Sequence, residues 1–257
     1  MMDFSSQISN TANTWEIPLL ENFISIQGEG RNQGRISSFL RFKDCNLSCP
    51  FCDTKLRMET GVESNFEVSE LVDTGFKYAN GNFVFTGGEP TLQKYWSYVF
   101  VVIKEIYNKW KETKCKFNVE FETNGYKIVD LMRYLYTNIE VYDCTWNWFA
   151  ECCDINLSPK GKDLNKNFIK HRVSNLIEYI PQNKICIKLL VDNNSVKDID
   201  KLLTELDKEK CIEKDNIYLM PLGASKEELS NTQNIYTLCI HHGVNFSSRI
   251  HIMHNMY

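Results

Sequence analysis

Cys45, Cys49 and Cys52 form a C-x3-C-x2-C pattern within one short segment of the chain. A structural zinc site uses four protein ligands, and a [4Fe–4S] cluster held by four cysteines has no open iron. Three thiolates on such a cluster would leave one iron free to bind and reduce a small molecule. The spacing therefore predicts an iron–sulfur cluster with one open coordination position.

Two other hypotheses exist for the same cysteines. A zinc site would need a fourth ligand, and none of the histidines lies near the segment or forms a paired half-motif with it. These histidines are His171, His241, His242, His251 and His254. A redox C-x-x-C pair would use Cys49 and Cys52 but would not need Cys45. The open cluster is the favoured interpretation because it uses all three cysteines.

A glycine-rich segment, Thr86-Gly87-Gly88-Glu89-Pro90, follows an expected short strand at residues 83–85. Paired glycines allow backbone N–H and C=O groups to approach a ligand closely. Glu89 could accept a hydrogen bond from a ligand cation. An ordinary turn between a strand and a helix is the alternative reading, because Gly-Gly is common in turns.

Together, the cysteine segment and Gly-Gly-Glu-Pro resemble radical S-adenosylmethionine (SAM) enzymes, and three further segments narrow the resemblance. These are Ser25-Ile26-Gln27-Gly28-Glu29-Gly30, Arg41 within Phe39-Leu40-Arg41-Phe42, and Cys52-Asp53-Thr54. With them, residues 16–160 are similar to the 7-carboxy-7-deazaguanine synthase family. The similarity weakens toward the C-terminus.

The resemblance implies a lyase that converts 6-carboxy-5,6,7,8-tetrahydropterin to 7-carboxy-7-deazaguanine with loss of ammonia. It implies a [4Fe–4S] cluster, SAM and Mg²⁺ as cofactors, and SAM is regenerated in each cycle. An electron donor such as flavodoxin is implied as a partner, and the family is commonly homodimeric.

The resemblance also assigns roles to individual residues. The cluster ligands would be Cys45, Cys49 and Cys52, and Thr54 would help to place Mg²⁺. The residues that would contact SAM are Phe51, Cys52, Asp53, Gly88, Glu122, Asn124, Ser158, Pro159 and Lys160. The residues that would bind the pterin are Ile26, Gln27, Gly28, Arg41 and Thr86.

Several of these roles suit the chemistry of the residues, and each has a structural alternative. The backbone of residues 26–28 could read the donor and acceptor edge of a pterin, and the planar guanidinium of Arg41 suits a carboxylate. Arg41 could instead form a surface ion pair. Thr54 could be a helix N-cap, and Lys160 could be a solvated lysine in a loop.

Short β-like segments alternate with helical patterns along the chain, which predicts a parallel sheet. We expect strands at 17–26, 38–42, 83–85, 117–122, 154–157, 184–191, 217–220 and 246–253. We expect helices at 68–79, 96–110, 128–136, 168–180, 196–208 and 226–242.

About six such strand–helix units are too few for a closed eight-fold barrel, so the expected fold class is α/β, a partial open (β/α)6-like barrel. The glycine segment, Glu122 to Asn124 and Ser158 to Lys160 then fall at the carboxyl ends of strands, where sites in such folds gather.

The composition sets further limits. The chain has 257 residues with 43% hydrophobic content and a net charge of -4, which predicts no broad nucleic-acid surface. No apolar run approaches the about 20 residues of a membrane span, and the start of the chain carries no basic and apolar leader pattern. We therefore expect a cytoplasmic protein with a flexible extension at 1–14 and one radical SAM domain at 15–257.

The remaining cysteines predict no second cluster, because no ferredoxin-like spacing joins them. We expect buried free thiols at Cys115, Cys144, Cys152, Cys153, Cys186, Cys211 and Cys239. Three features depart from the family pattern. Met220-Pro221 stands where the family often has Gln-Pro, residues 142–153 are unusually aromatic, and residues 249–254 match the family only loosely.

Two functions of other kinds compete with the synthase. A radical SAM activase for a glycyl-radical enzyme would share the cysteines and the glycine segment, but Gln-Gly-Glu-Gly favours a pterin pocket. A non-catalytic iron–sulfur electron-transfer protein would be favoured by a four-cysteine site, which this segment is not.

Overall fold

The structure is a computed structural model that describes residues 15–139, 146–223, 225–230, 232–254 and 256. The expected extension at 1–14 and Cys144 lie outside the described residues. One continuous apolar core connects the sheet with the helices that cover it.

The core is built on an eight-stranded sheet in the order β10-β9-β8-β7-β6-β5-β3-β2. All neighbours in it are parallel except β2 and β3, which are antiparallel. The strands are β2 (Glu21–Ile26), β3 (Ile36–Phe42), β5 (Asn82–Gly87), β6 (Asn118–Thr123), β7 (Cys153–Leu157), β8 (Ile185–Val191), β9 (Ile217–Pro221) and β10 (Asn245–Phe246). Because β2 and β10 are the two edges of the sheet, the barrel is open, as predicted.

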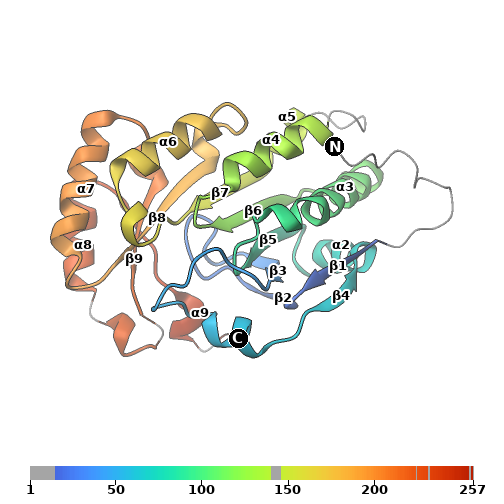
Figure 1. The fold of residues 1–257 in the computed structure, drawn as a ribbon, viewed down its shortest axis with the longest axis horizontal. Helices are drawn as coiled ribbons and strands as arrows, with labels where there is room; N and C mark the ends of the chain where they lie inside the picture. The colour runs from blue at the N-terminus through green and yellow to red at the C-terminus, as the bar shows by residue number, and fades with distance from the viewer. Residues whose placement is uncertain (1–14, 140–145, 224, 231, 255, 257) are drawn as a thin grey trace.

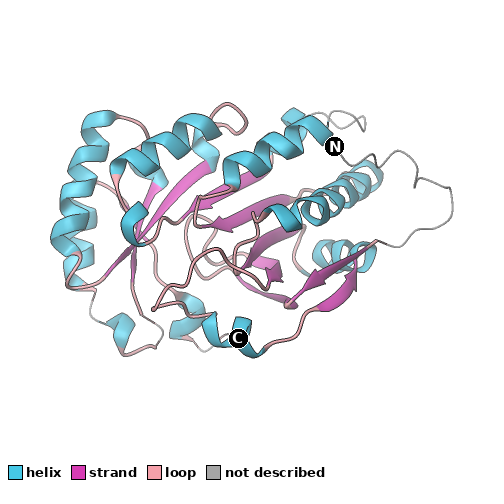
Figure 2. Cartoon of the chain, in the orientation of Figure 1, coloured by secondary structure: helices cyan, strands magenta, loops and turns pink. Residues whose placement is uncertain are grey.

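Helices cover one face of the curved sheet, and long loops cross the other face (Figures 1 and 2). The covering helices are α2 (Val68–Tyr78), α3 (Trp96–Thr113), α4 (Ile128–Ile139), α5 (Trp146–Glu151), α6 (Lys166–Leu176), α7 (Val196–Glu209) and α8 (Gln233–His242). The short helices α1 (Lys55–Thr60) and α9 (Ile250–Met253) lie on the loop side. A separate two-stranded sheet pairs β1 (Glu16–Leu19) with β4 (Ser64–Glu67).

The periodicity of apolar residues accounts for this layering. In α3 the buried residues Val99, Val102, Ile103 and Ile106 recur at the spacing of one helical face. The central strand β7 is buried at every position, as expected for a parallel strand covered on both sides. Some buried positions of β6 and β7 nevertheless carry polar side chains, among them Glu120, Asp154 and Asn156. The loop side of the sheet therefore has a polar interior.

Three element predictions need correction. The strand expected at 17–26 is interrupted at Leu20, whose N–H donates to Arg41 O; the part before this break is β1, which pairs with β4, and only the part after it, β2, joins the main sheet. The helix expected at 226–242 begins only at Gln233. The strand expected at 246–253 ends after Phe246 and continues into α9, because the chain turns across the loop side of the sheet.

The aromatic part of residues 142–153 serves packing. Within the described residues, Trp148 packs against Tyr107, Trp110 and Phe117 at ring-centroid distances of 4.8, 5.5 and 4.5 Å. Trp146 donates its indole N–H to Tyr179 O at 2.7 Å. These contacts fasten α5 to the outer helices.

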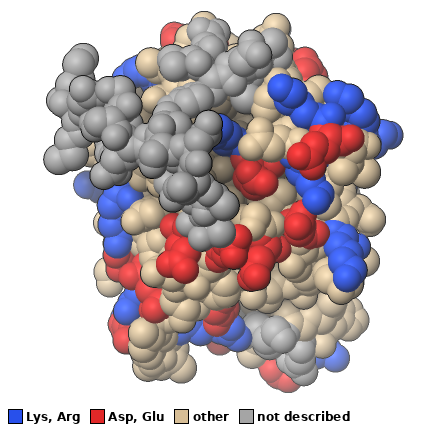
Figure 3. All heavy atoms as spheres, turned by 90° about the vertical axis from the view of Figure 1, so that its right-hand side faces the viewer, with Lys and Arg blue, Asp and Glu red and all other residues tan. Residues whose placement is uncertain are grey.

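The face formed by α2, α3, β1 and β4 carries acidic and basic side chains together, with a group of carboxylates near its middle (Figure 3). Lys109 and Asp73 form one of its ion pairs between α3 and α2. Among the described residues, every helix is too short or too polar to cross a membrane.

Candidate functional site

A cavity of about 550 Å³ opens at the carboxyl ends of the parallel strands. All residues that the sequence assigns to cofactor, metal or substrate line this cavity, except Pro159, which is buried beside it. They come from the β2–β3 loop, β3, the segment before α1, and the ends of β5, β6 and β7. The topology of the sheet thus brings together motifs that are far apart in the chain.

The three cysteines lie in the cluster loop, which we define as residues 43–54 between β3 and α1. All three are half-buried free thiols that face the cavity. Burial raises the pKa of Cys45, and it raises that of Cys49 against the opposing effect of Lys160.

Three free thiols that face one cavity suit an iron–sulfur cluster with one open iron, because each thiolate binds a different iron of a cubane. A closed zinc site would need a fourth protein ligand beside them.

Gly87 and Gly88 are required where β5 meets the cluster loop. Gly87 has φ +111°, and a Cβ on Gly88 would lie 2.1 Å from Asp44 O. Glycine instead permits Gly88 N–H to donate to Phe42 O at 2.9 Å and Glu89 N–H to donate to Asp44 O at 2.7 Å. The glycine segment thus holds the start of the cluster loop through backbone contacts.

Glu89 follows β5 and lies, almost fully buried, at the wall of the cavity. It is 1% exposed, and its oxygens accept hydrogen bonds from Thr91 N–H and Oγ1, Thr123 Oγ1 and Asn124 N–H at 2.6–3.1 Å. Burial raises its pKa against these donors. These hydrogen bonds give Glu89 a structural role, because they tie the end of β5 to the end of β6.

Asn124 extends this connection to the cluster loop. Its backbone is held by Glu89, and its side-chain amide donates to Asn46 Oδ1 at 2.8 Å and lies 4.0 Å from Cys45 Sγ. The predicted SAM residue Asn124 therefore directly supports the loop that carries the cysteines.

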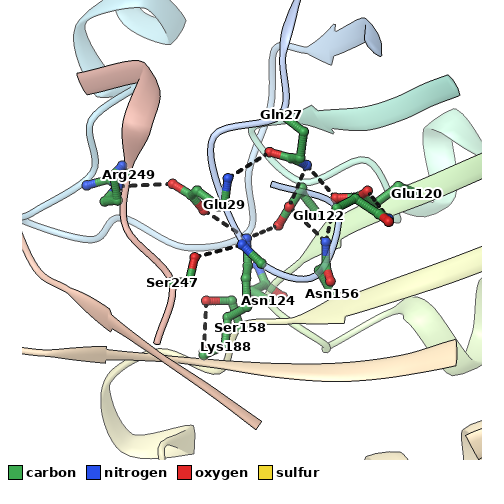
Figure 4. A network of polar contacts seen from close by, with 12 residues as sticks. Gln27, Glu29, Glu120, Glu122, Asn124, Asn156, Ser158, Lys188, Ser247 and Arg249 are labelled. Atoms are coloured by element: carbon green, nitrogen blue, oxygen red, sulfur yellow. Dashed lines mark hydrogen bonds and ion pairs between the residues drawn. The ribbon is translucent and has the colours of Figure 1, made fainter. Parts of the chain in front are cut away.

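Gln27 belongs to a buried polar network (Figure 4). Its amide donates to Glu120 and, at 3.3 Å, to Glu122, while its Oε1 accepts from Glu29 N–H at 3.2 Å. Its backbone N–H and C=O are bonded to Arg35 O and Gly34 N–H. With 3% exposure, Gln27 holds the loop in shape at the wall of the cavity.

Glu120 is the most deeply placed carboxylate of this network. Besides Gln27, its oxygens accept from Asn156 Nδ2 at 2.6 Å and Asn32 Nδ2 at 2.7 Å. Burial, followed by repulsion from Glu122, raises the pKa of Glu120 to about 8. The network therefore contains a carboxyl group that holds its proton near neutral pH.

Lys188 is the buried cation of the site. Its Nζ donates to Glu29 Oε2 at 2.8 Å and to Glu122. Burial alone would lower the pKa of Lys188, but the two carboxylates raise it. Burial alone would raise the pKa of Glu29, yet Lys188 and Arg249 bring it well below its usual value. The pairs are thus charged, and they join the β2–β3 loop to β6 and β8.

Arg41 lies at the wall of the cavity on β3. Its Nε donates to Glu21 Oε2 at 3.1 Å, and its guanidinium lies 5.3 Å from the ring centre of Phe23. Its side chain is 14% exposed, so the pair with Glu21 is half-buried rather than a surface pair. Arg57 shares the same carboxylate at 2.8 Å.

Thr54 and Lys160 each had a structural alternative, a helix N-cap for Thr54 and a solvated loop lysine for Lys160. Thr54 precedes α1, but its side chain makes no capping hydrogen bond and its Oγ1 lies 3.3 Å from Cys52 Sγ. Lys160 donates to Ser158 Oγ at 2.7 Å. Burial, assisted by Lys188, lowers the pKa of Lys160 to about 8. Lys160 is therefore a cavity cation rather than a solvated loop lysine.

The remaining described cysteines are free thiols away from the cavity. Cys153, Cys186 and Cys239 are buried as predicted, whereas Cys152 and Cys211 are half-buried and Cys115 is exposed. The expectation of burial was wrong for Cys115, because it lies in the exposed turn after α3.

Sequence reasoning missed several residues of the cavity. The sequence did contain an indication for Lys188, since it is a single charged residue within the otherwise apolar strand Ile185–Val191. It contained no local pattern that would assign Arg249 and His251 to the cavity, because their segment was predicted as a strand. Met220, where the family often has glutamine, lines the cavity with a side chain that cannot donate a hydrogen bond.

Comparisons with known proteins identify relatives of this chain. Residues 40–140 match the family model of the Radical SAM superfamily. The chain is 31% identical to a 7-carboxy-7-deazaguanine synthase of Clostridium acetobutylicum over 79% of this chain and 80% of the relative. It is 27% identical to one of Hyperthermus butylicus over 98% of both chains.

The solved structure of QueE from Escherichia coli shares the fold, with a TM-score of 0.56 and 21% identity over 91% of this chain and 93% of that one. The extent of these similarities, together with a cavity that unites the cysteine, glycine and Gln-Gly-Glu-Gly motifs, decides the family. The chain belongs to the 7-carboxy-7-deazaguanine synthase family of radical SAM enzymes.

Proposed function

We propose that the cavity converts 6-carboxy-5,6,7,8-tetrahydropterin to 7-carboxy-7-deazaguanine with release of ammonia. The observation that carries this proposal is the meeting of the three cysteines, Gly88, Arg41 and the Gln-Gly-Glu-Gly loop around one cavity. Its volume, about 550 Å³, lies in the range of small-molecule sites. Family membership supports a radical SAM lyase of this kind.

In this proposal Cys45, Cys49 and Cys52 hold a [4Fe–4S] cluster with one open iron. When bound, the cluster and SAM supply the electron and the hydrogen-abstracting radical. The protein supplies the surroundings of SAM, for which the proposed contacts are Phe51, Cys52, Asp53, Gly88, Glu122, Asn124, Ser158, Pro159 and Lys160. The cationic Lys160 at the rim suits the methionyl carboxylate of SAM.

The pterin would lie between β2, β3 and the end of β5. Arg41 would pair with its carboxylate, which requires the guanidinium to be shared with or released from Glu21. Ile26, Gln27, Gly28 and Thr86 would contact the ring, and Gln27 also shapes the loop around it. Thr54 would supply one oxygen to a Mg²⁺ ion on the substrate carboxylate.

The chain's own charges would keep this arrangement rigid during turnover. Lys188 stays protonated between Glu29 and Glu122, and so orients both carboxylates without taking part in proton transfer. The deep network around Glu120 fixes Gln27 and keeps the interior hydrogen-bonded. Such preorganisation limits the reorganisation required when substrate binds.

We further propose an electron donor such as flavodoxin, a homodimer and a cytoplasmic location. The electron donor is supported by the cluster, because the cluster needs an external electron. The cytoplasmic location is supported by the three free thiols that bind the cluster, because thiols persist in a reducing compartment. We also propose that residues 15–257 form one radical SAM domain.

The test is conversion by anaerobically reconstituted protein. With reductant, SAM and 6-carboxytetrahydropterin, mass spectrometry should detect 7-carboxy-7-deazaguanine, and Mg²⁺ should accelerate its formation. SAM should not be consumed in proportion to product. Protein that cleaves SAM but leaves the pterin unchanged would refute the substrate assignment and restore the glycyl-radical activase as a candidate.

A further inference from the structure

The cluster loop is held differently at its two ends. At its start, Asp44 and Asn46 contact the glycine segment, Lys94 and Asn124. At its end, Asp53 follows the last cysteine directly, and its side chain is paired with Arg249. The residues after it begin α1, which has no buried residue. Together with the pair between Arg57 of α1 and Glu21, the ion pair with Arg249 is thus a tertiary contact that holds this end of the loop.

Arg249 joins three separate segments through one guanidinium. Its Nη2 donates to Asp53, its Nε donates to Glu29 Oε1 at 3.0 Å, and its Nη1 donates to Gly223 O. It is only 5% exposed and lines the cavity. A planar fork can satisfy acceptors in three directions, whereas a lysine at this position could not reach all of them in the same way.

The charges continue from Arg249 into the site (Figure 4). Glu29, held by Arg249 on one oxygen, is held by Lys188 on the other at 2.8 Å, and Lys188 also pairs with Glu122. Opposite charges therefore alternate from Asp53 to Glu122 across the cavity floor. Each member is restrained by at least one neighbour of opposite charge.

The segment that carries Arg249 is itself attached to the β2–β3 loop. Gly30 N–H donates to Ser247 Oγ at 2.7 Å, and Ile250 N–H donates to Gly28 O at 3.2 Å. His251 lies so close to Gly28 that a Cβ there would be 1.9 Å from its Nδ1. The substrate segment and residues 247–251 therefore behave as one unit, and Arg249 connects this unit to the cluster loop.

We propose that Arg249 is a positioning residue that fixes the SAM side of the site relative to the substrate side by holding Asp53 and Glu29 together. The inference rests on the proposed function, since it assumes that the cluster loop binds SAM and the Gln-Gly-Glu-Gly loop binds the pterin. Without Arg249, the end of the cluster loop moves independently of the substrate loop. SAM is then cleaved more often without product being formed.

The first measurement uses metal-free protein, so that it is independent of cofactor and activity. The amides of Cys52, Lys55 and Met58 donate within the end of the loop and the start of α1, and their hydrogen exchange reports local opening. Arg249→Met should accelerate this exchange by about tenfold, because it removes a charge-assisted contact. Unchanged exchange would overturn the proposal.

Arg31→Met is the matched control. Arg31 lies in the β2–β3 loop, to which Arg249 is bonded through Glu29, and it contacts Asn183 O, Asn216 and Asp154 but does not line the cavity. The Arg31→Met variant should leave amide hydrogen exchange in the cluster loop unchanged. An equal acceleration by Arg31→Met would mean a general loosening of the fold and would contradict a specific role for Arg249.

A double variant identifies the partner. In the absence of SAM, Asp53→Asn should accelerate the same exchange, and Arg249→Met with Asp53→Asn should be no faster than Arg249→Met alone. Additive effects would exclude the pair. If Arg249→Met does not fold, Arg249→Lys replaces it, with an expected intermediate acceleration and with wild-type exchange as the refuting result.

The second measurement uses reconstituted enzyme and the ratio of 5′-deoxyadenosine released to 7-carboxy-7-deazaguanine formed. Arg249→Met should raise this ratio at least about fivefold at unchanged iron content, and Arg31→Met should not. A wild-type ratio in Arg249→Met would refute the coupling. Wild-type protein that forms no product would refute the proposed function instead, while the exchange result would stand by itself.

Discussion

The three cysteines of the cluster loop differ from the other described cysteines in facing the cavity. Replacing Cys45, Cys49 or Cys52 by serine should abolish iron binding and SAM cleavage, because one missing thiolate leaves the cluster with two ligands. Iron analysis and the visible absorbance of reconstituted protein measure this. Cys152→Ser, which changes a half-buried thiol elsewhere, should retain full iron; a loss there would argue for a second metal site.

Arg41 is the residue best suited to a substrate carboxylate. Arg41→Ala should lower kcat/KM for the pterin by at least about tenfold, since a charge-assisted hydrogen bond contributes about 1.5–3 kcal/mol. SAM affinity, measured by calorimetry, should remain nearly unchanged because Glu21 retains Arg57 as a partner. Arg133→Ala on the exposed face of α4 is the control. An equal loss of SAM affinity in Arg41→Ala would assign Arg41 to the support of the loop.

Glu120 makes stability depend on pH. Its pKa is raised to about 8 by burial and by Glu122, so the folded protein holds a proton that the unfolded chain releases near its ordinary value of 4.5. The folded state then binds more protons between these values, and its contribution to stability is complete below about pH 4.5 and is lost as pH rises through about 8.

The thermal midpoint of the metal-free protein should therefore decrease as the pH rises from about 5 to about 8, and Glu120→Gln should flatten this decrease. Substitution of the exposed Glu112 by glutamine should leave the slope as in wild type. A wild-type slope in Glu120→Gln would show that another group carries the proton.

At the scale of elements, the end of β5 and the start of the cluster loop are packed backbone against backbone. The same contact explains why a glycine pair stands at the end of a strand that is otherwise buried and apolar. The glycine motif is thus a packing requirement as well as a feature of the ligand site, since it sets the position of the cysteines.

Gly88→Ala should destabilise the protein by about 1–3 kcal/mol, because its Cβ would lie 2.1 Å from Asp44 O and the backbone must shift. It should also weaken SAM binding. Urea denaturation and calorimetry measure the two effects. Gly161→Ala, where no atom lies within 4 Å of the added Cβ, is the control that adds a methyl group without a clash; an equal loss of SAM affinity there would contradict the packing argument.

At the scale of the whole molecule, the open sheet leaves its loop side to be completed by polar contacts and by ligands. Closed barrels fill their interior with apolar side chains. The interior of this open barrel instead holds the polar residues Lys188, Glu120 and Asn156, and each of them forms a hydrogen bond or an ion pair. Binding of a ligand to the folded state alone should consequently stabilise the entire chain.

SAM at about 100 times its Kd should raise the thermal midpoint of reconstituted protein by about 5–10 °C, from about 2.7 kcal/mol of binding free energy and about 2–4 °C per kcal/mol. Cys45→Ser, which lacks the cluster, should show little of this shift under the same anaerobic conditions. Equal stabilisation of both proteins would mean that SAM binds without the open iron.

The sequence by itself determined the chemistry at the rim of the site. The cysteine spacing, the glycine pair and Ser158 to Lys160 are local patterns, and parallel strand–helix repeats bring the carboxyl ends of strands to one edge. Pattern and topology together were therefore sufficient to predict which motifs meet. The same periodicity located the main helices, because it depends only on neighbours along the chain.

The tertiary structure alone decided what lies beneath and behind these motifs. Arg249 reaches Asp53 and Glu29 from the other end of the chain, and Lys188 lies between Glu29 and Glu122. Such ion pairs depend on where strands and loops pack, and no local spacing encodes them. The same holds for the break at Leu20 and for α9, where contacts with distant backbone override the β-like pattern of the sequence.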